Sequence, residues 1–142
     1  MAEWFTIRFI DEASLDLPGI YRWEIDGIEV YVGRYTRASR PLREYRNNVA
    51  RIHDSRPYRR ADPDGFRTIH RALAQAALER RQIELVILEN CHPDRLNERE
   101  RWHIAQLSDA HRLNGQRRER EKPKAVSPPL PCAPPPAPPR SP

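Results

Sequence analysis

Residues 19–35 constrain the fold more than any other part of the chain, because they have the pattern of a β-hairpin. Two runs rich in β-branched and aromatic residues, 19–25 and 28–33, flank the pair Asp26-Gly27. Such runs form strands, and an Asp-Gly pair between them is a strong signal for a tight turn. We therefore expect two neighbouring antiparallel strands in the first third of the chain.

The register of this hairpin is open between two alternatives. A two-residue turn would gather the apolar side chains on one face, namely Tyr21, Trp23, Ile25, Ile28, Val30 and Val32. A three-residue loop, with Gly27 in the left-handed conformation, would instead set Tyr21 directly opposite Tyr31. The alternation of apolar and polar residues favours the two-residue turn.

Two helices are expected after the hairpin. The first begins at Ser39, with Pro41 in its first turn, because apolar residues then recur at helical spacing. These residues are Leu42, Tyr45, Val49 and Ile52. After a loop with several Pro and Gly residues, a second amphipathic helix extends from Phe66 to about Arg81.

A short apolar strand over residues 83–88 and a third helix after Pro93 complete the order β-β-α-α-β-α. Residues 4–10 can add an edge strand. This order predicts an α/β fold, a small α/β sandwich whose mostly antiparallel, three-stranded sheet is flanked by helices. The inner stripe of the third helix consists of Leu96, Ile104 and Leu107.

The end of the chain is not expected to join this fold. Residues 116–142 are charged and then mostly Pro and Ala, a composition that cannot bury a core and predicts disorder or polyproline II structure. The folded domain is therefore expected over residues 1–115. An inert extension is the simplest interpretation of the tail, with a ligand for a proline-binding partner or a basic tether for nucleic acid as alternatives.

Positive charge is concentrated in one part of the expected domain. The chain has a net charge of +5, and residues 34–60 hold nine Arg against Glu44 and Asp54. Since the tail is also basic, the rest of the domain is acidic. A basic segment in an acidic frame favours a focused site for a polyanion, and a solvated arginine-rich helix is the alternative.

The sequence suggests a soluble cytoplasmic protein. No basic segment followed by an apolar run opens the chain, and no stretch approaches the roughly 20 apolar residues of a membrane span. We therefore expect no membrane association. Cys91 and Cys132 are the only cysteines, and the second lies in the tail, so a disulfide framework is not expected.

Glu100 occupies a position that needs a physical explanation. It lies four residues from both Leu96 and Ile104, on the stripe expected to face the core. Burying an unpaired charge is costly, so its carboxylate should meet a cation. An arginine would give a structural ion pair, and a hard ion such as Mg²⁺ would give a metal site.

Two motifs on the hairpin suggest a family. Gly19-Ile20-Tyr21 is followed by Tyr31-Val32-Gly33 ten residues later, and then by an arginine-bearing helix and a late glutamate. With these features the chain resembles the GIY-YIG nuclease family over most of residues 18–115. Either triplet occurs by chance, but both at this spacing on a hairpin form a more specific pattern. The resemblance implies a metal-dependent endonuclease that hydrolyses phosphodiester bonds.

The resemblance assigns a role to both motif tyrosines. Tyr21 and Tyr31 match the residues whose hydroxyls, in such nucleases, are thought to orient or deprotonate the attacking water. A phenol with an ordinary pKa of about 10 is a poor base at neutral pH, so a metal or neighbouring cations must help. Both hydroxyls must then reach one pocket, which favours the three-residue loop. Without the rest of the pattern, ordinary strand packing would explain both residues.

The family arginine lies in the first turns of the helix after the hairpin, where its planar donor fork can neutralise the phosphate in the transition state. Arg43 fits this place best, and Arg40 is its competitor. Further contacts to the substrate are expected from Gly33, Arg34, Arg46 and Arg51.

The resemblance makes Glu100 the single metal ligand of the family. One carboxylate, together with water and substrate phosphate, suits Mg²⁺ or Mn²⁺. Its place on the inner stripe makes it preferable to Glu98. Asn114, followed by Gly115, resembles the closing asparagine of the family, and a helix-ending Asn-Gly pair explains it equally well.

His70 is a weaker candidate for the site. It sits one position beyond the apolar stripe of the second helix, beside Arg67 and Arg71. It can serve as an auxiliary proton donor or a phosphate contact, and a partly exposed structural histidine is the favoured alternative.

We expect an endonuclease whose partner is nucleic acid, DNA before RNA. The rival is a nucleic-acid-binding module that has kept the fold and lost catalysis. The complete set of Tyr21, Tyr31, Arg43 and Glu100 favours the enzyme.

Overall fold

The computed structural model of this protein describes residues 3–114. In chain order its elements are β1 (Thr6–Phe9), β2 (Gly19–Ile25), β3 (Ile28–Tyr35), η1 (Arg40–Glu44), α1 (Tyr45–His53), α2 (Thr68–Leu78), β4 (Ile83–Asn90), η2 (Pro93–Arg95) and α3 (Leu96–Ala105). The predicted tail, residues 116–142, and Cys132 within it lie outside the described residues.

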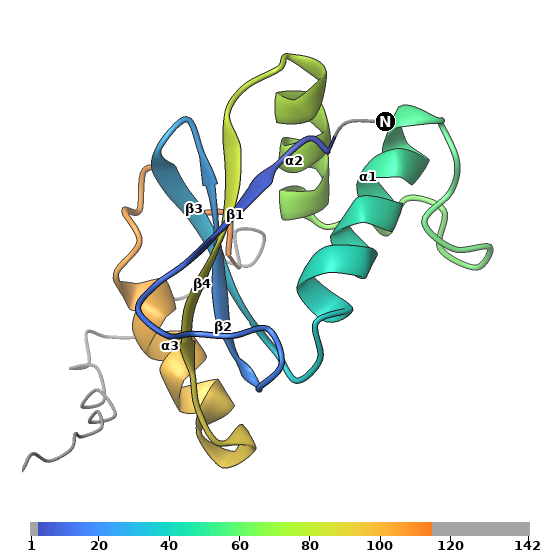
Figure 1. Ribbon diagram of the computed structural model, residues 1–142. Helices are drawn as coiled ribbons and strands as arrows, with labels where there is room; N and C mark the ends of the chain where they lie inside the picture. Colours follow the sequence, from blue (N-terminus) through green and yellow to red (C-terminus); the bar gives the residue numbers. More distant parts are fainter. Residues whose placement is uncertain (1–2, 115–142) are drawn as a thin grey trace, which may run out of the picture.

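The sheet has four strands in the order β1-β4-β2-β3 (Figure 1). β2 is antiparallel to both of its neighbours, whereas β1 runs parallel to β4. The α/β class is confirmed, but the three-stranded sheet is wrong by one strand, because the N-terminal segment does add an edge. The residues of β1 are all exposed, and their partner strand lies far along the chain, so no local signal predicted this pairing.

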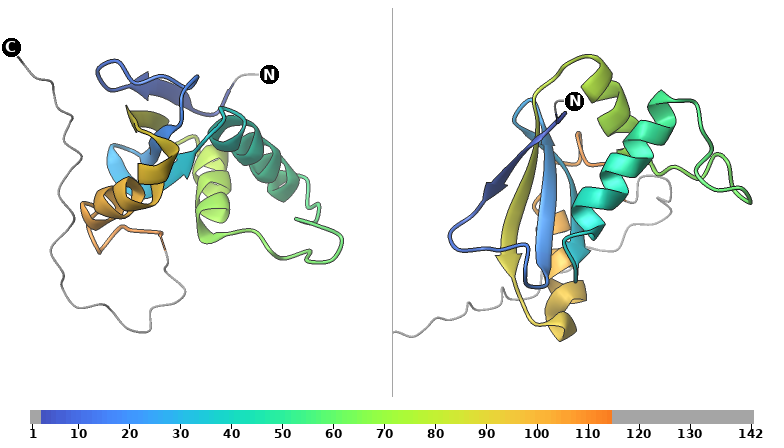
Figure 2. Two further views of the ribbon diagram at one scale, coloured as in Figure 1. Left: turned by 90° about the horizontal axis from the view of Figure 1, so that it is seen from below. Right: turned by 45° about the vertical axis from the view of Figure 1, so that its right-hand side comes forward.

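Helices cover both faces of the sheet, α1 and α2 on one and α3 on the other (Figures 1 and 2). The larger core lies under α1 and α2 and includes the buried side chains of Trp23 and Leu73. The smaller core lies under α3, where Ile20 and Val32 pack with Leu96. Because side chains alternate along a strand, β2 contributes to both cores.

The turn of the hairpin has the two-residue form. Ile25 pairs with Ile28, and the two residues between them, Asp26 and Gly27, have φ angles of 53° and 81°. Positive φ at both central positions defines the turn type that matches the twist of antiparallel strands. Glycine adopts this conformation without strain, and aspartate tolerates it better than most residues.

A β-bulge then changes the alternation of β3. The register shifts between Trp23 and Glu24, so that Trp23 pairs with Tyr31 and Tyr21 pairs with Gly33. Without this shift Tyr31 would point to the opposite face. Tyr21 and Tyr31 therefore share one face but are not directly opposite each other, and neither predicted register is right along the whole hairpin.

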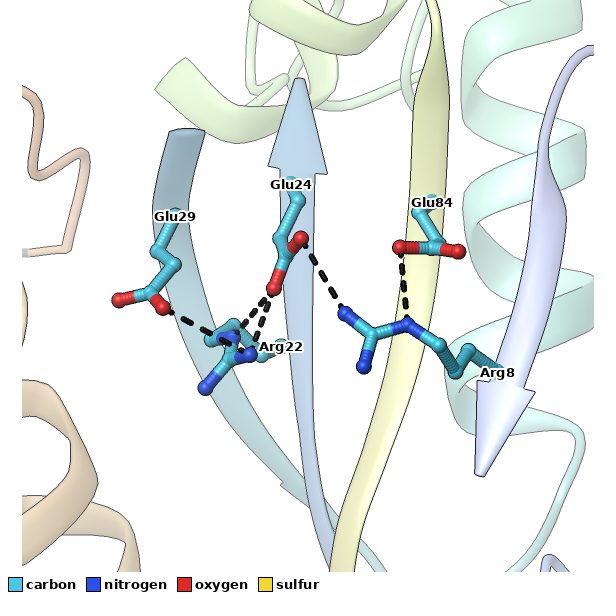
Figure 3. Close-up of polar contacts among 5 residues, drawn as sticks. All are labelled: Arg8, Arg22, Glu24, Glu29 and Glu84. Atoms are coloured by element: carbon cyan, nitrogen blue, oxygen red, sulfur yellow. Dashed lines mark hydrogen bonds and ion pairs between the residues drawn. The ribbon is translucent and has the colours of Figure 1, made fainter. Parts of the chain in front are cut away.

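On the face that α3 covers, a ladder of charged side chains crosses all four strands (Figure 3). Arg8 contacts Glu84 at 3.1 Å and Glu24 at 3.5 Å. Arg22 contacts the other oxygen of Glu24 at 2.6 Å and Glu29 at 3.6 Å. The buried carboxylate of Glu24 thus lies between two cations, which compensates the cost of removing it from water.

The three predicted helices are present with shifted ends. The first begins as the π-helical turn η1, in which the Glu44 N–H donates to the Ser39 carbonyl at 3.1 Å. α2 is shorter than predicted, because Arg67 is still extended and Arg80 adopts a left-handed φ of 58°. No helix within residues 3–114 combines the length and the apolar character that crossing a membrane requires.

Candidate functional site

Tyr21 and Tyr31 lie together on the sheet face under α1 and α2. Their ring centroids are 6.5 Å apart. The Tyr21 ring lies directly over Gly33, where a Cβ atom would collide with it. Gly33 was predicted to contact the substrate, but it is buried, and its observed role is to leave room for the Tyr21 ring.

Tyr45 on α1 joins these two tyrosines, and we call Tyr21, Tyr31 and Tyr45 the tyrosine cluster. The hydroxyls of Tyr21 and Tyr45 share a hydrogen bond of 2.8 Å. Burial, assisted by the neighbouring phenols, raises the pKa of both residues above the ordinary tyrosine value. Both phenols therefore stay protonated at neutral pH.

In the sequence, Tyr45 belongs to an apolar stripe and has no other mark. The signal that could have distinguished it from Leu42 or Val49 is its hydroxyl, because a buried tyrosine usually needs a hydrogen-bond partner. That signal predicts a partner without identifying Tyr21, which lies 24 positions earlier.

Arg67, just before α2, brings a cation to the cluster. Its Nη1 donates a hydrogen bond to the Tyr31 hydroxyl at 3.2 Å. Burial alone would lower the pKa of Arg67, but Tyr31, Tyr45 and Tyr21 raise it, so the guanidinium stays charged. In the sequence, Arg67 is notable only as a neighbour of His70, and no local pattern reveals its contact to a strand so far away in the chain.

A cavity of about 510 Å³ opens where β3 ends. It is lined by Arg34, Tyr35, Thr36, Arg37, Ser39, Arg40, Arg43, Glu44, Asn47 and Leu96, and we call it the arginine cavity. Arg40 forms an ion pair with Glu44 at 3.3 Å. Arg37 and Arg43 have no ion pair with any residue between 3 and 114. The basic segment identified in the sequence therefore forms a concave surface with uncompensated positive charge.

Arg40 and Glu44 connect the arginine cavity to the tyrosine cluster. Burial and Tyr31 raise the pKa of Tyr21, and the charge of Arg40 acts in the opposite direction and lowers it. The charge of Glu44 likewise contributes to the raised pKa of Arg67. Both cavity residues are thus within electrostatic range of the cluster. Both candidates for the motif arginine, Arg40 and Arg43, line the same cavity.

Glu100 on α3 lies beside the arginine cavity through its contact with Arg34. Arg34 Nη1 is 3.2 Å from Glu100 Oε1 and also contacts Asn97 Oδ1. Of the two cations that the sequence left open for Glu100, the structure contains the arginine. The side chains of Glu100 and Arg34 are 21% and 48% exposed, so the pair is not a buried one. The fully core-facing orientation was wrong, since the neighbouring Arg99 is the buried residue.

The oxygens around Arg34 also suit a hard cation. A carboxylate oxygen of Glu100 and the amide oxygen of Asn97 converge on one nitrogen of Arg34, and both are ligand types that Mg²⁺ accepts. Within residues 3–114 there is no group of three or more His, Cys, Asp or Glu side chains placed to hold a metal. A Mg²⁺ ion here would keep mostly water ligands and would compete with Arg34.

His70 is 1% exposed, so the partly exposed position predicted for it is wrong. Its Nδ1 accepts a hydrogen bond from the Arg67 backbone N–H at 3.1 Å, and its Nε2 lies 3.3 Å from the Asn48 amide. Burial, followed by the charges of Arg67, Arg40 and Arg71, lowers its pKa to about 4. A neutral, enclosed imidazole supports the structural interpretation over a phosphate contact.

Asn114 is bound to the open edge of β3. Its side chain accepts from the Val32 N–H at 2.9 Å and donates to the Val32 carbonyl at 2.8 Å. Since α3 ends at Ala105, the alternative of a helix-ending asparagine is wrong. The observed contacts extend the pairing of an edge strand by one residue.

Arg46 and Arg51 lie outside the arginine cavity. Arg46 contacts Glu3 at 2.6 Å and lies over the Phe5 ring, so it holds the N-terminal segment against α1. Arg51 lines a second cavity, described below. The structure therefore groups Arg34, Arg40 and Arg43 and leaves Arg46 apart.

Comparisons of this chain with protein-family models, with curated proteins and with solved structures gave no match. The candidate site thus depends on the sequence motifs and on the geometry described above.

Proposed function

We propose that this protein is a divalent-metal-dependent endonuclease, similar to GIY-YIG nucleases, which hydrolyses phosphodiester bonds in nucleic acid, with DNA as the expected substrate, in the cytoplasm. The observation that carries the proposal is the arginine cavity next to the tyrosine cluster. Arg37 and Arg43 have no acidic partner within residues 3–114, so the cavity attracts an anion. The motif pair on the hairpin supports a phosphodiester as that anion.

The arginines of the cavity bind and stabilise the phosphate in this proposal. A guanidinium donates two parallel hydrogen bonds to phosphate oxygens. Negative charge on these oxygens grows as water attacks, so a positioned cation stabilises the transition state more than the ground state. Arg43 is a stronger candidate than Arg40, because Glu44 already compensates the charge of Arg40.

Tyr31, not Tyr21, is the candidate for contact with the attacking water. The Tyr21 hydroxyl is bonded to Tyr45 and the residue is 2% exposed, so Tyr21 acts as a positioning residue. The Tyr31 hydroxyl accepts a hydrogen bond from Arg67. Arg67 thus holds the Tyr31 oxygen beside a positive charge, which supports a role in orienting or deprotonating water.

Glu100 would hold the metal, with Asn97 as a neighbouring oxygen and water as the other ligands. Bound Mg²⁺ supplies Lewis-acid stabilisation of charge on the phosphate oxygens. Arg34 would then leave Glu100, and its guanidinium would be available to contact the phosphate backbone.

A cleavage panel tests this proposal. Labelled branched, flap, nicked and linear DNA and single-stranded RNA are incubated with Mg²⁺, Mn²⁺ or EDTA. We expect cleavage of at least one DNA with metal and none with EDTA, and loss of cleavage in Arg43→Ala and Tyr31→Phe. Arg56→Gln is the control, because Arg56 lies outside the lining of both cavities and pairs with Asp54 at 3.9 Å. A wild-type chain that cleaves no substrate would overturn the enzymatic assignment.

The alternative is a nucleic-acid-binding module of the same fold without catalysis. The contact between Arg34 and Glu100 favours this alternative, because it occupies the carboxylate that would hold the metal. A module of this kind would bind nucleic acid with the same affinity in EDTA and in Mg²⁺ and would leave all substrates intact.

A further inference from the structure

A second cavity, of about 260 Å³, adjoins the arginine cavity along α1. Its lining consists of Glu44, Asn47, Asn48, Arg51, Tyr58 and Arg59. Glu44 and Asn47 line both cavities, so the two are adjacent. A helix rises by about 1.5 Å per residue, which separates Arg43 in the first cavity from Arg51 in the second by about 12 Å. A ligand that fills both cavities is therefore elongated.

Asn48, a wall residue that is 3% exposed, lies between His70 and Arg51. Because His70 Nδ1 accepts from the Arg67 N–H, the proton of the neutral ring lies on Nε2. Nε2 must then donate to Asn48, which requires the amide oxygen on the His70 side. The structure has this oxygen on the other side, where it accepts from Arg51 Nη1 at 3.3 Å, so the Asn48 amide cannot satisfy both donors at once.

Two hydrogen-bond donors, His70 Nε2 and Arg51 Nη1, thus compete for one amide oxygen at the wall of the second cavity. Within residues 3–114, Arg51 has no acceptor besides this shared oxygen. Glu44, the acid of the cavity, is already paired with Arg40. A phosphate oxygen would accept from the half-buried Arg51 and from the Asn48 amino group, and it would leave the amide oxygen to His70.

Tyr58 provides a flat aromatic surface in the same cavity. Phe66 packs edge-on against its ring, with the centroids 5.3 Å apart, and holds it in place. The guanidinium of Arg59 lies over the ring, with its Cζ 4.8 Å from the centroid, so a planar polar group already occupies the place that a base would take, and Arg59 moves aside when a base stacks. A nucleobase is such a group, and bases stack on aromatic side chains with little dependence on sequence.

From these contacts we propose that the second cavity is a subsite for an unpaired nucleotide adjacent to the phosphate in the arginine cavity. Its phosphate accepts hydrogen bonds from Asn48 and Arg51, and its base stacks on Tyr58. A base inside a continuous duplex cannot reach this ring without leaving its stack. The protein therefore prefers single-stranded or branched nucleic acid. This inference rests on the nucleic-acid ligand of the proposed function, but not on cleavage.

Binding of labelled oligonucleotides to the full chain tests the subsite. Fluorescence anisotropy in EDTA compares single-stranded DNA, single-stranded RNA of the same sequence and blunt duplex DNA. Tyr58→Leu should weaken single-strand binding by about 5- to 150-fold, the range for loss of one stacking aromatic, and leave duplex binding unchanged. Tyr58→Phe keeps the ring and should bind as wild type, as should the control Arg56→Gln. The DNA and RNA arms show which sugar the subsite accepts.

A second measurement does not depend on how well Tyr58→Leu folds. A strand with 2-aminopurine at successive positions should lose fluorescence at one position when it binds wild type or Tyr58→Phe, because stacking quenches this base. Arg51→Gln should weaken binding of the same strand and reduce its dependence on salt. Equal losses for single strands and duplex in Tyr58→Leu, or no quenched position, would overturn the subsite.

The two assignments fail in different ways. Single-strand binding through Tyr58 without cleavage would support the subsite and overturn the endonuclease. Cleavage that is insensitive to Tyr58→Leu, with equal affinity for single strand and duplex, would overturn the subsite alone. Absence of any nucleic-acid binding would overturn both.

Discussion

The tyrosine cluster and the arginine cavity are neighbours, but their polar groups are satisfied in different ways. In the cluster, the Tyr21 and Tyr45 hydroxyls bond each other inside the core. In the cavity, the guanidinium groups of Arg37 and Arg43 are exposed and have no ion pair within residues 3–114. Polar groups that satisfy each other stabilise the fold, whereas cations without partners are available to a ligand.

This difference distinguishes the residues that stabilise the fold from the residues that are available to a substrate. Substitutions in the buried part of the cluster should reduce stability, and substitutions in the cavity should reduce activity with little effect on folding. Tyr31 lies at the boundary, because it is 8% exposed and its hydroxyl contacts Arg67 and not another tyrosine.

The largest effect is expected from Arg43→Ala. Loss of one positioned donor to the transition state should lower the cleavage rate by about 10²- to 10³-fold, with a smaller loss of substrate affinity. The melting temperature should not change, because Arg43 is exposed and has no ion pair in the described chain. Single-turnover cleavage measures the rate and anisotropy measures the affinity, with Arg40→Ala in parallel and Arg56→Gln as the control. Equal losses of rate and affinity would make Arg43 an ordinary phosphate contact.

Acid should destabilise the fold through His70. Its pKa is lowered from 6.5 to about 4, so between these values the unfolded chain binds more protons than the folded chain. Stability contributed by the neutral imidazole is complete above pH 6.5 and is lost as the pH falls toward 4. At 1.36 kcal/mol per pH unit, the loss is about 3 kcal/mol.

Urea unfolding between pH 4 and pH 7 measures this loss, with His70→Gln as the comparison. The variant should show a shallower decrease of the free energy of unfolding on acidification, because a glutamine does not titrate. Parallel pH profiles for the two proteins would show that His70 is not the group responsible.

Tyr45→Phe should mainly reduce stability, whereas Tyr31→Phe should mainly reduce activity. Tyr45→Phe leaves the Tyr21 hydroxyl buried without a partner, which should cost about 1–3 kcal/mol of unfolding free energy. Tyr31→Phe removes a hydroxyl whose hydrogen bond within residues 3–114 is to Arg67 alone, so it should cost less stability and more activity. Thermal melts and cleavage assays of both variants measure the two losses. Equal losses of stability and activity in both variants would contradict the distinction between a structural Tyr45 and a functional Tyr31.

The sequence predicted the elements of the fold better than their pairing. Helical spacing located α1, α2 and α3 to within a few residues, because each has an apolar stripe that depends only on local periodicity. The parallel pairing of β1 with β4 was not predicted, since it joins the two ends of the domain and leaves β1 exposed. The bulge in β3 was not predicted either. The Asp26-Gly27 pair predicts the turn, but it does not predict a later shift of register.

The residues of the candidate site were likewise predicted only where the local sequence marks them. Tyr21, Tyr31 and the arginines after β3 could be singled out because motif and charge mark them in the sequence. Arg67 and Tyr45 could not, because their roles come from hydrogen bonds to residues distant in the chain. Glu100 was recognised as needing a cation, but its degree of exposure could not be read from a helical stripe.

The smallest effect on stability is expected for Glu100→Gln, and it tests the metal assignment. Had the carboxylate been fully buried against an arginine, its loss would be expected to cost several kcal/mol. The observed pair with Arg34 is partly exposed on both sides, so its loss should change the free energy of unfolding by less than about 1 kcal/mol. If Glu100 holds Mg²⁺, cleavage should disappear while the melting temperature and DNA binding in EDTA stay close to those of wild type. Glu98→Gln is the matched control, because Glu98 lies on the same helix and pairs with Arg95 at 2.9 Å. A Glu100→Gln variant that melts much earlier but still cleaves would show that this carboxylate supports the fold and not the metal.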